Sequence, residues 1–153
     1  MLRELREGLA QTLQVGMPEA RVLPAPPIVL DWPDSRLLVW VQPSATWCEP
    51  WLSMGHGGRG TVYFDVVVTV PAPDGDDSDA TYAALDDAVD PLSSGTSVFA
   101  ALEADPTLGI TAFEVTSVSM LEGVSAPEVA TIGDANAVRY VAVVPVKITV
   151  QRS

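Results

Sequence analysis

Thr61-Val-Tyr-Phe-Asp-Val-Val-Val-Thr-Val70 alternates between apolar residues on one side and a mixed set on the other. Successive side chains of a β-strand point to opposite faces, so this spacing predicts a strand with one well-buried face. Such a face has to be covered by other elements, and the flanking sequence supplies them. The predicted buried face consists of Val62, Phe64, Val66, Val68 and Val70, and the opposite face of Thr61, Tyr63, Asp65, Val67 and Thr69.

Further strands are predicted on both sides of this one. Ile28–Leu30 follows a proline-rich stretch and predicts a short strand or edge segment, and Leu37–Gln42 predicts another strand. Ile110–Leu121 and Val138–Val150 are rich in β-forming residues and also alternate. Pro145 lacks an amide hydrogen, so the last strand should lie at an edge or a bulge there. The alternation groups Phe113, Val115, Ser117, Ser119 and Leu121 in one strand, and Val138, Tyr140, Ala142, Val144, Val146, Ile148 and Val150 in the other.

An amphipathic helix is predicted near the start of the chain. Residues 2–15 carry leucines at steps of three and four, which is the spacing of one helix face. Gly16 suits the left-handed conformation that follows many helices, and Pro18 prevents the helix from continuing.

Two further helices are predicted between the strands. Residues 79–92 would bury one apolar stripe, and a short helix capped by Thr96 should end before Pro106. The chain, residues 1–153, therefore predicts a single α+β domain. Its mostly antiparallel sheet of four to five strands would carry the N-terminal helix and the two further helices on one face. The predicted stripe consists of Tyr82, Leu85, Val89 and Leu92.

A long loop or arm is predicted over residues 43–60, because this stretch has little periodicity and much Gly, Ser and Pro. Trp47 and Trp51 lie in it without a regular element to hold them. They either fold back over the core or anchor the chain to another subunit, where Trp is favoured. His56 and Arg59 complete the candidate interface.

The side chains that carry chemistry are few. The glycines around His56 match neither a phosphate-binding loop nor a dinucleotide-binding pattern. Cys48 and His56 cannot form a four-ligand zinc site, although a Cys–His nucleophile pair is conceivable. The acidic run Asp74–Asp79 does not match an EF-hand, and it indicates a solvated turn at which an opportunistic divalent ion stays open. We therefore expect neither catalysis nor a cofactor or metal site.

The charge of the chain is strongly uneven. No Lys or Arg lies between Arg59 and Arg139, and this span holds fourteen of the twenty acidic residues. Nucleic-acid binding depends on clustered positive charge, so we expect no specific nucleic-acid binding and no attraction to anionic membranes. No apolar run approaches the roughly 18 residues of a membrane span, and the acidic start predicts no signal peptide. Cys48 is the one cysteine, which excludes an internal disulfide and agrees with cytosolic folding.

The order of these elements, ending in Arg139-Tyr-Val-Ala-Val-Val-Pro-Val-Lys-Ile-Thr-Val150, resembles the tail terminator proteins of long-tailed bacteriophages. The resemblance implies an α+β subunit that forms a hexameric ring on the tail tube, ends tube polymerisation and offers a surface to the head–tail connector proteins. It implies a virion protein of the tail or neck, assembled in the host cytoplasm, that acts by contact alone.

Other functions remain as alternatives. Another neck or head-completion protein of the same virion class would show a similar order of elements. Two alternatives are less favoured: a small ligand-binding or enzymatic α+β domain, and an adaptor that binds through a strand edge. An acid-rich lumen would keep DNA from adhering to a ring. The candidate lumen residues are Asp74, Asp76, Asp77, Asp86, Asp87 and Asp90.

Overall fold

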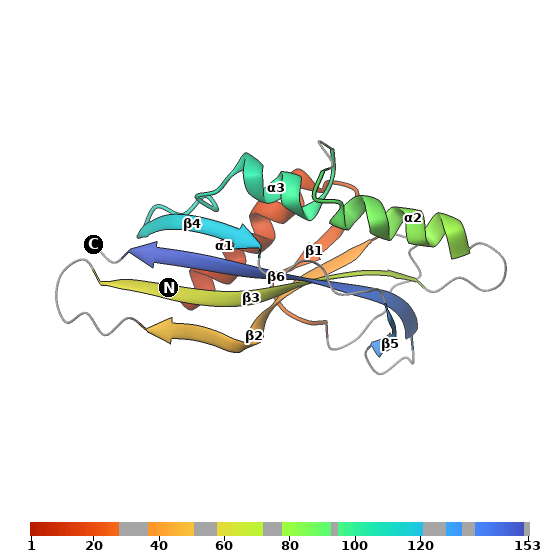
Figure 1. Cartoon of the computed structure of the whole chain (residues 1–153), viewed down its shortest axis with the longest axis horizontal. Helices are drawn as coiled ribbons and strands as arrows, with labels where there is room; N and C mark the ends of the chain where they lie inside the picture. The colour runs from red at the N-terminus through yellow and green to blue at the C-terminus, as the bar shows by residue number, and fades with distance from the viewer. Residues whose placement is uncertain are drawn as a thin grey trace.

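The computed structural model describes residues 1–27, 37–50, 58–71, 78–92, 95–120, 128–132 and 137–151. These residues form a sheet with helices on one face, which confirms the predicted α+β class (Figure 1). The elements, in chain order, are α1 Leu2–Gly16, β1 Arg21–Leu23, β2 Leu38–Pro50, β3 Arg59–Pro71, α2 Ser78–Val89, α3 Val98–Ala104, β4 Glu114–Met120, β5 Glu128–Ile132 and β6 Ala137–Gln151.

The described strands form one six-stranded sheet in the order β1-β2-β3-β6-β4, with β5 also paired to β6. All pairs are antiparallel except β1 with β2, which is parallel. Two strands, β1 and β5, were not predicted from the sequence, because three and five residues are too short for a clear alternation. The short strand expected at Ile28–Leu30 lies outside the described residues.

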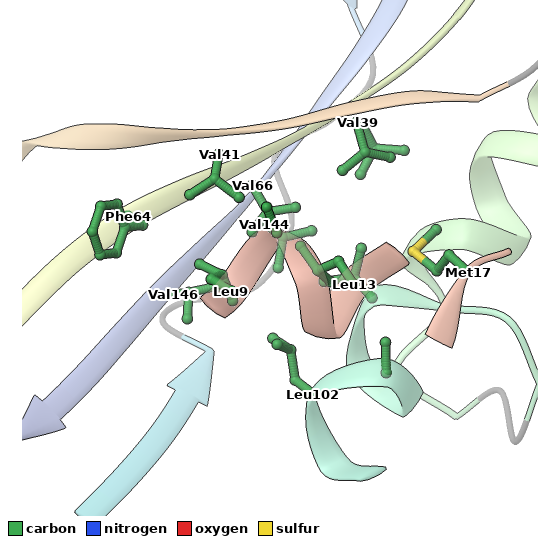
Figure 2. Packing of buried hydrophobic residues seen from close by; sticks show 14 of the residues in the cluster. Leu9, Leu13, Met17, Val39, Val41, Phe64, Val66, Leu102, Val144 and Val146 are labelled. Atoms are coloured by element: carbon green, nitrogen blue, oxygen red, sulfur yellow. The ribbon is translucent and has the colours of Figure 1, made fainter. Parts of the chain in front are cut away.

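The main core lies between the helices and one face of the sheet. Its centre is the alternating face of β3, where every predicted inward residue is at most 2% exposed. In Figure 2, Leu9 of α1 lies beside Val146 of β6, and the same core cluster contains Leu13, Phe64, Val66 and Leu102 of α3. The predicted inward face of β6 is likewise buried from Ala142 to Val150. The buried faces of β3 and β6, which are far apart in the sequence, therefore belong to one core that also contains residues of α1.

The opposite face of the sheet carries a smaller apolar cluster of Leu38, Trp40, Val67 and Val141. A polar connection lies beside it. The buried Arg139 of β6 donates from Nε to Thr69 Oγ1 of β3 at 2.8 Å, and the same hydroxyl donates to the carbonyl of Leu38 in β2 at 3.0 Å. Burial lowers the pKa of the Arg139 guanidinium. These hydrogen bonds connect three neighbouring strands. The polar side chains on this face are therefore held in fixed positions, as the apolar side chains of the main core are.

Gly16 does not have the role that the sequence predicts for it. It is the last residue of α1, and the residue after the helix, Met17, has φ −128°. A Cβ atom on Gly16 would lie 2.3 Å from the Cβ of Ala101, so glycine is required by the close approach of α3 and not by a left-handed cap. The contact joins residues that are far apart in the chain, and local spacing cannot reveal it.

The two later helices follow the prediction except at their ends. The last helical residue of α2 is Val89, so Leu92 lies beyond the helix and is 91% exposed rather than part of the buried stripe. The N-cap of α3 is Ser97, whose hydroxyl accepts from the amide of Ala100 at 3.1 Å, and not Thr96. The helix ends at Ala104, before Pro106, as expected.

The predicted strand Ile110–Leu121 is shorter and is interrupted. It begins at Glu114, and its pairing with β6 shifts between Val115 and Ser117. The extra residue, Thr116, donates its hydroxyl to the carbonyl of Thr149 at 3.0 Å. A bulge reverses the alternation beyond it, so Val118 rather than Ser117 packs beside Val115 against the main core.

Pro145 does not mark a sheet edge, because β6 is an interior strand with β3 on one side and β4 and β5 on the other. β5 pairs with β6 as far as Val141, and β4 begins to pair at Val146. Within the described residues, Pro145 therefore falls between these two partners while it pairs with Asp65 of β3. A missing amide hydrogen is tolerated where a ladder is interrupted.

Candidate assembly surfaces

Most of the stretch predicted as a loop over residues 43–60 is a β-hairpin. β2 continues to Pro50 and β3 begins at Arg59, with Glu49 opposite Thr61. The expectation of a loop is wrong for residues 43–50 and 59–60, because an irregular edge strand also tolerates low periodicity and residues such as proline that cannot donate a backbone hydrogen bond. The hairpin extends to one end of the molecule, where the last described residues of β6 also lie (Figure 1).

The outer strand of the hairpin is irregular at one point. Pro43 pairs with Phe64 and Cys48 pairs with Val62, so Ser44–Trp47 all lie opposite Tyr63. Trp47 thus belongs to a bulge of β2 and not to a loop. Bulges interrupt strand pairing and redirect side chains, and they are common at sheet edges.

Of the other interface candidates, only Arg59 lies within the described residues. Arg59 is exposed at the first position of β3 and pairs with Gln151 of β6. Trp51 and His56 lie outside the described residues, as does any contact between them and Cys48. A role of Trp47, Trp51, His56 and Arg59 in an interface therefore stays a prediction.

The acidic candidates that the structure describes are found at the other end of the sheet. Asp86 and Asp87 are exposed on α2, and Asp90 is half-buried and accepts the amide of Leu92 on Oδ1 at 2.8 Å. Asp90 therefore closes a local turn after the helix. Asp74, Asp76 and Asp77 lie outside the described residues.

The hairpin end and the acidic helix are not brought together. β3 begins at the hairpin end with Arg59, and α2 follows the opposite end of β3, which is Pro71. Thirteen residues of strand span about 40 Å at about 3.3 Å per residue. Figure 1 shows α2 at the end of the molecule away from the hairpin. A partner that binds one surface need not touch the other.

Two open strand edges flank the hairpin end of the sheet. β1 pairs with β2 only at Leu38–Trp40, so the described residues leave Val41–Pro50 without a strand on its outer side. On the far side of the sheet, β4 pairs with β6 alone among the strands that the structure describes. The edge of a sheet can serve as a template for pairing with another chain. Sequence reasoning raised binding through a strand edge but could not identify the strands that form the edges, because edges are defined by strand order.

The face of the sheet away from the helices is polar at the hairpin end. Tyr63, Asp65 and Lys147 are all half-buried there, and no hydrogen bond or ion pair involves the Asp65 carboxylate within the described residues. Burial raises the pKa of Asp65. Nearby, Trp40 Nε1 donates to Gln42 Oε1 at 2.9 Å. Among the described residues, an interior strand therefore carries a carboxylate without a hydrogen-bond or ion-pair partner on this face.

Within the described part of the chain, no three His, Cys, Asp or Glu side chains gather as a metal site would require. None of the described helices is long and apolar enough to cross a membrane. The candidate surfaces for binding another copy or a partner protein are the two strand edges, the polar sheet face and the acidic helix.

Comparison with known proteins gives no identity. No protein-family model matches the chain, and no curated protein matches it significantly. Among the solved structures that match, one chain whose name states no function is 21% identical, with a TM-score of 0.33. The match covers 97% of this chain and 92% of the other. A TM-score this low does not establish a shared fold, so the likeness carries no argument.

Proposed function

We propose that this chain is a structural virion protein that caps the tail tube of a long-tailed bacteriophage as a ring. The observation that carries the proposal is the pair of open strand edges at one end of the sheet, because such edges suit a subunit that joins others of its kind. We identify this assembly with a tail terminator because the order of helices and strands resembles that of tail terminator proteins. The charge distribution supports it further, since a net charge of −12 disfavours adhesion to DNA.

In this role the protein acts by shape and contact. One face of the ring ends polymerisation of the tail tube protein, and the other offers the surface to which the head–tail connector proteins attach. The ring is a homo-oligomer of six subunits in the tail or neck of the virion. A different neck or head-completion protein of the same virion class is the alternative within this proposal.

Purified protein tests the proposal directly. Multi-angle light scattering over a range of concentrations gives the mass of the particle, and negative-stain microscopy shows whether it has a central hole. The same protein is then mixed with tail tubes from the virus whose genome encodes it. We expect rings, either free or at tube ends.

Binding at one end of the tube with arrest of its growth separates a terminator from a neck protein that joins only the head. A chain that stays monomeric at all concentrations and is absent from tube ends contradicts the proposal. A monomer that instead binds a small molecule favours the ligand-binding alternative.

A further inference from the structure

The short strand β1 is held from both of its sides. It is the outermost described strand on the β2 side of the sheet (Figure 1). On its inner side it pairs with β2 in parallel, and Arg21 donates its amide to the carbonyl of Leu37 at 2.9 Å. On its outer side it meets no strand that the structure describes, and the side chain of Gln14 from α1 takes that place.

The Gln14 amide makes the hydrogen bonds of a neighbouring strand. Its Nε2 donates to the carbonyl of Ala20 at 2.9 Å, and its Oε1 accepts from the amide of Val22 at 3.1 Å. A residue of a parallel strand bonds in the same way, because it donates to one residue of its neighbour and accepts from the residue two positions further along. One side chain thus satisfies two peptide groups that point away from β2.

The local sequence brings Gln14 to this position. α1 ends at Gly16, and the amide of Ala20 donates to the carbonyl of Met17 at 3.0 Å, which turns the chain back beside the end of the helix. Gln14 Nε2 also donates to the Met17 carbonyl, at 3.4 Å. Because Gln14 lies in the last turn of α1, its side chain reaches the turn and the strand together.

β1 depends on this second support because it is short. It consists of three residues, and its pairing with β2 ends where Leu23 lies opposite Trp40. Parallel pairing is also slightly less stable per residue than antiparallel pairing. Without the Gln14 amide, the strand would lose two part-buried hydrogen bonds on its outer side.

β1 lies along the most apolar part of β2. Leu37–Val41 is a run of five apolar residues without charge or proline. Three of them, Leu38, Val39 and Trp40, are opposite β1 and are at most 6% exposed. An apolar strand edge of this kind pairs readily with strands of other chains, so natural proteins cover or blunt such edges.

We infer that the Gln14 side chain is a lock that keeps β1 on β2, and that β1 held in this way closes the apolar part of the β2 edge to strands of other chains. The contact is autoinhibitory, because it limits where the sheet can be extended. The inference goes beyond the proposed function and does not depend on it, since an apolar strand edge promotes unspecific association in any protein.

Gln14→Met tests the lock, because methionine has a similar length and helix propensity but lacks the amide group. Hydrogen exchange followed by NMR reports on β1. We expect the amides of Arg21 and Val22 to exchange at least about tenfold faster than in the original chain, because two hydrogen bonds that hold the strand are lost. The Arg21 amide is decisive, since it faces β2 and loses protection only when β1 separates from β2.

Light scattering over a range of concentrations and negative-stain microscopy report on the edge of β2. We expect Gln14→Met to form irregular species that grow with time, at concentrations at which the original chain forms none. Circular dichroism of each variant confirms that it is folded. If Gln14→Met does not fold, Gln14→Asn is the milder variant, because its amide is one methylene shorter and cannot span the same distance.

Two controls separate the lock from a general loss of stability. Gln11→Met makes the same change at an exposed position of α1 and should alter neither measurement. Ser97→Ala removes the cap of α3, which lies outside β1, and should lower stability without irregular association.

The possible results either support or overturn the inference. Faster exchange of Val22 alone, with Arg21 still protected, overturns the lock and makes Gln14 a cap of the helix end. Faster exchange of both amides without irregular association overturns the closing role of β1, and so does equal association of Gln14→Met and Ser97→Ala. Whether the original chain forms rings on tail tubes is a separate observation, so the failure of one proposal leaves the other intact.

Discussion

Gly16 allows α1 and α3 to pack closely, because it has no side chain. An added Cβ would lie 2.3 Å from the Cβ and 2.7 Å from the Cα of Ala101. Alanine is favoured over glycine in helices by about 1 kcal/mol, but overpacking of this kind costs about 1–3 kcal/mol. We expect Gly16→Ala to lower the free energy of unfolding, measured by urea denaturation.

The matched control for this prediction is Gly60→Ala, because a Cβ there would meet only Val150 at an ordinary 3.8 Å. Its stability should change little. Ala101→Gly introduced with Gly16→Ala should recover part of the loss. If Gly16→Ala is as stable as the original chain, α1 and α3 are not in close contact in solution.

Asp65 makes the stability of the fold depend on pH. Burial raises its pKa in the folded state, so the folded state favours the protonated carboxyl. Stability is therefore greater below the unfolded pKa, near 3.9, and falls as pH rises through the unfolded value toward the folded one. We expect Asp65→Asn to stabilise the isolated protein at neutral pH, with the difference vanishing in acid.

Denaturation of the original chain and of Asp65→Asn, from acid to neutral pH, measures the difference in stability. Asp86→Asn is the control, because Asp86 is exposed on α2. An Asp65→Asn variant that is less stable at neutral pH would show that the carboxylate has a stabilising partner in the isolated chain.

The start of α3 depends on one capping side chain. Ser97 is fully buried and its hydroxyl accepts the Ala100 amide at the start of α3. Replacement of such a cap by alanine typically costs about 1 kcal/mol, so Ser97→Ala should lower the midpoint of thermal unfolding. Thr96→Ala is the control, since Thr96 is exposed. Equal losses in the two variants would contradict the assignment of the cap.

The elements that could be predicted from sequence are those whose pattern is local. The alternation of β3 and β6 and the leucine spacing of α1 each identify a buried face without knowledge of its partner. The bulges of β2 and β4 could not be predicted, because a bulge depends on the register of the neighbouring strand. The strands that form the sheet edges could not be identified for the same reason, since strand order joins β6 to β3 across the helical segment.

Replacement of Trp47 tests whether the hairpin takes part in assembly. Its backbone lies in the bulge of an open edge strand, and buried Trp anchors commonly contribute 2 kcal/mol or more of binding, about thirtyfold in affinity. We expect Trp47→Ala to fold normally but to assemble about thirtyfold more weakly, as measured by sedimentation. Trp40→Phe is a contrasting variant, because Trp40 lies 6% exposed in the sheet's second cluster and should affect stability instead. A Trp47→Ala chain that unfolds identifies Trp47 as a core residue.

At the scale of the whole molecule, charge opposes association and backbone pairing favours it. Each copy carries a net charge of −12, so neighbouring copies repel one another. The Debye length falls from about 30 Å at 0.01 M salt to about 8 Å at 0.15 M. Backbone hydrogen bonds between strand edges involve no net charges and should be little affected. Association should therefore strengthen as salt is added over this range.

Asp86→Asn with Asp87→Asn lowers the charge from −12 to −10 without touching either strand edge. This double variant should associate more readily at low salt and respond less to added salt, as light scattering at matched concentrations will measure. The fold should be unaffected, because exposed substitutions usually change stability by less than about 0.5 kcal/mol. If association instead weakens steadily with salt, attraction between opposite charges holds the copies together. In that case Arg59 at the hairpin end, and not the backbone of β2 and β4, is the first group to examine.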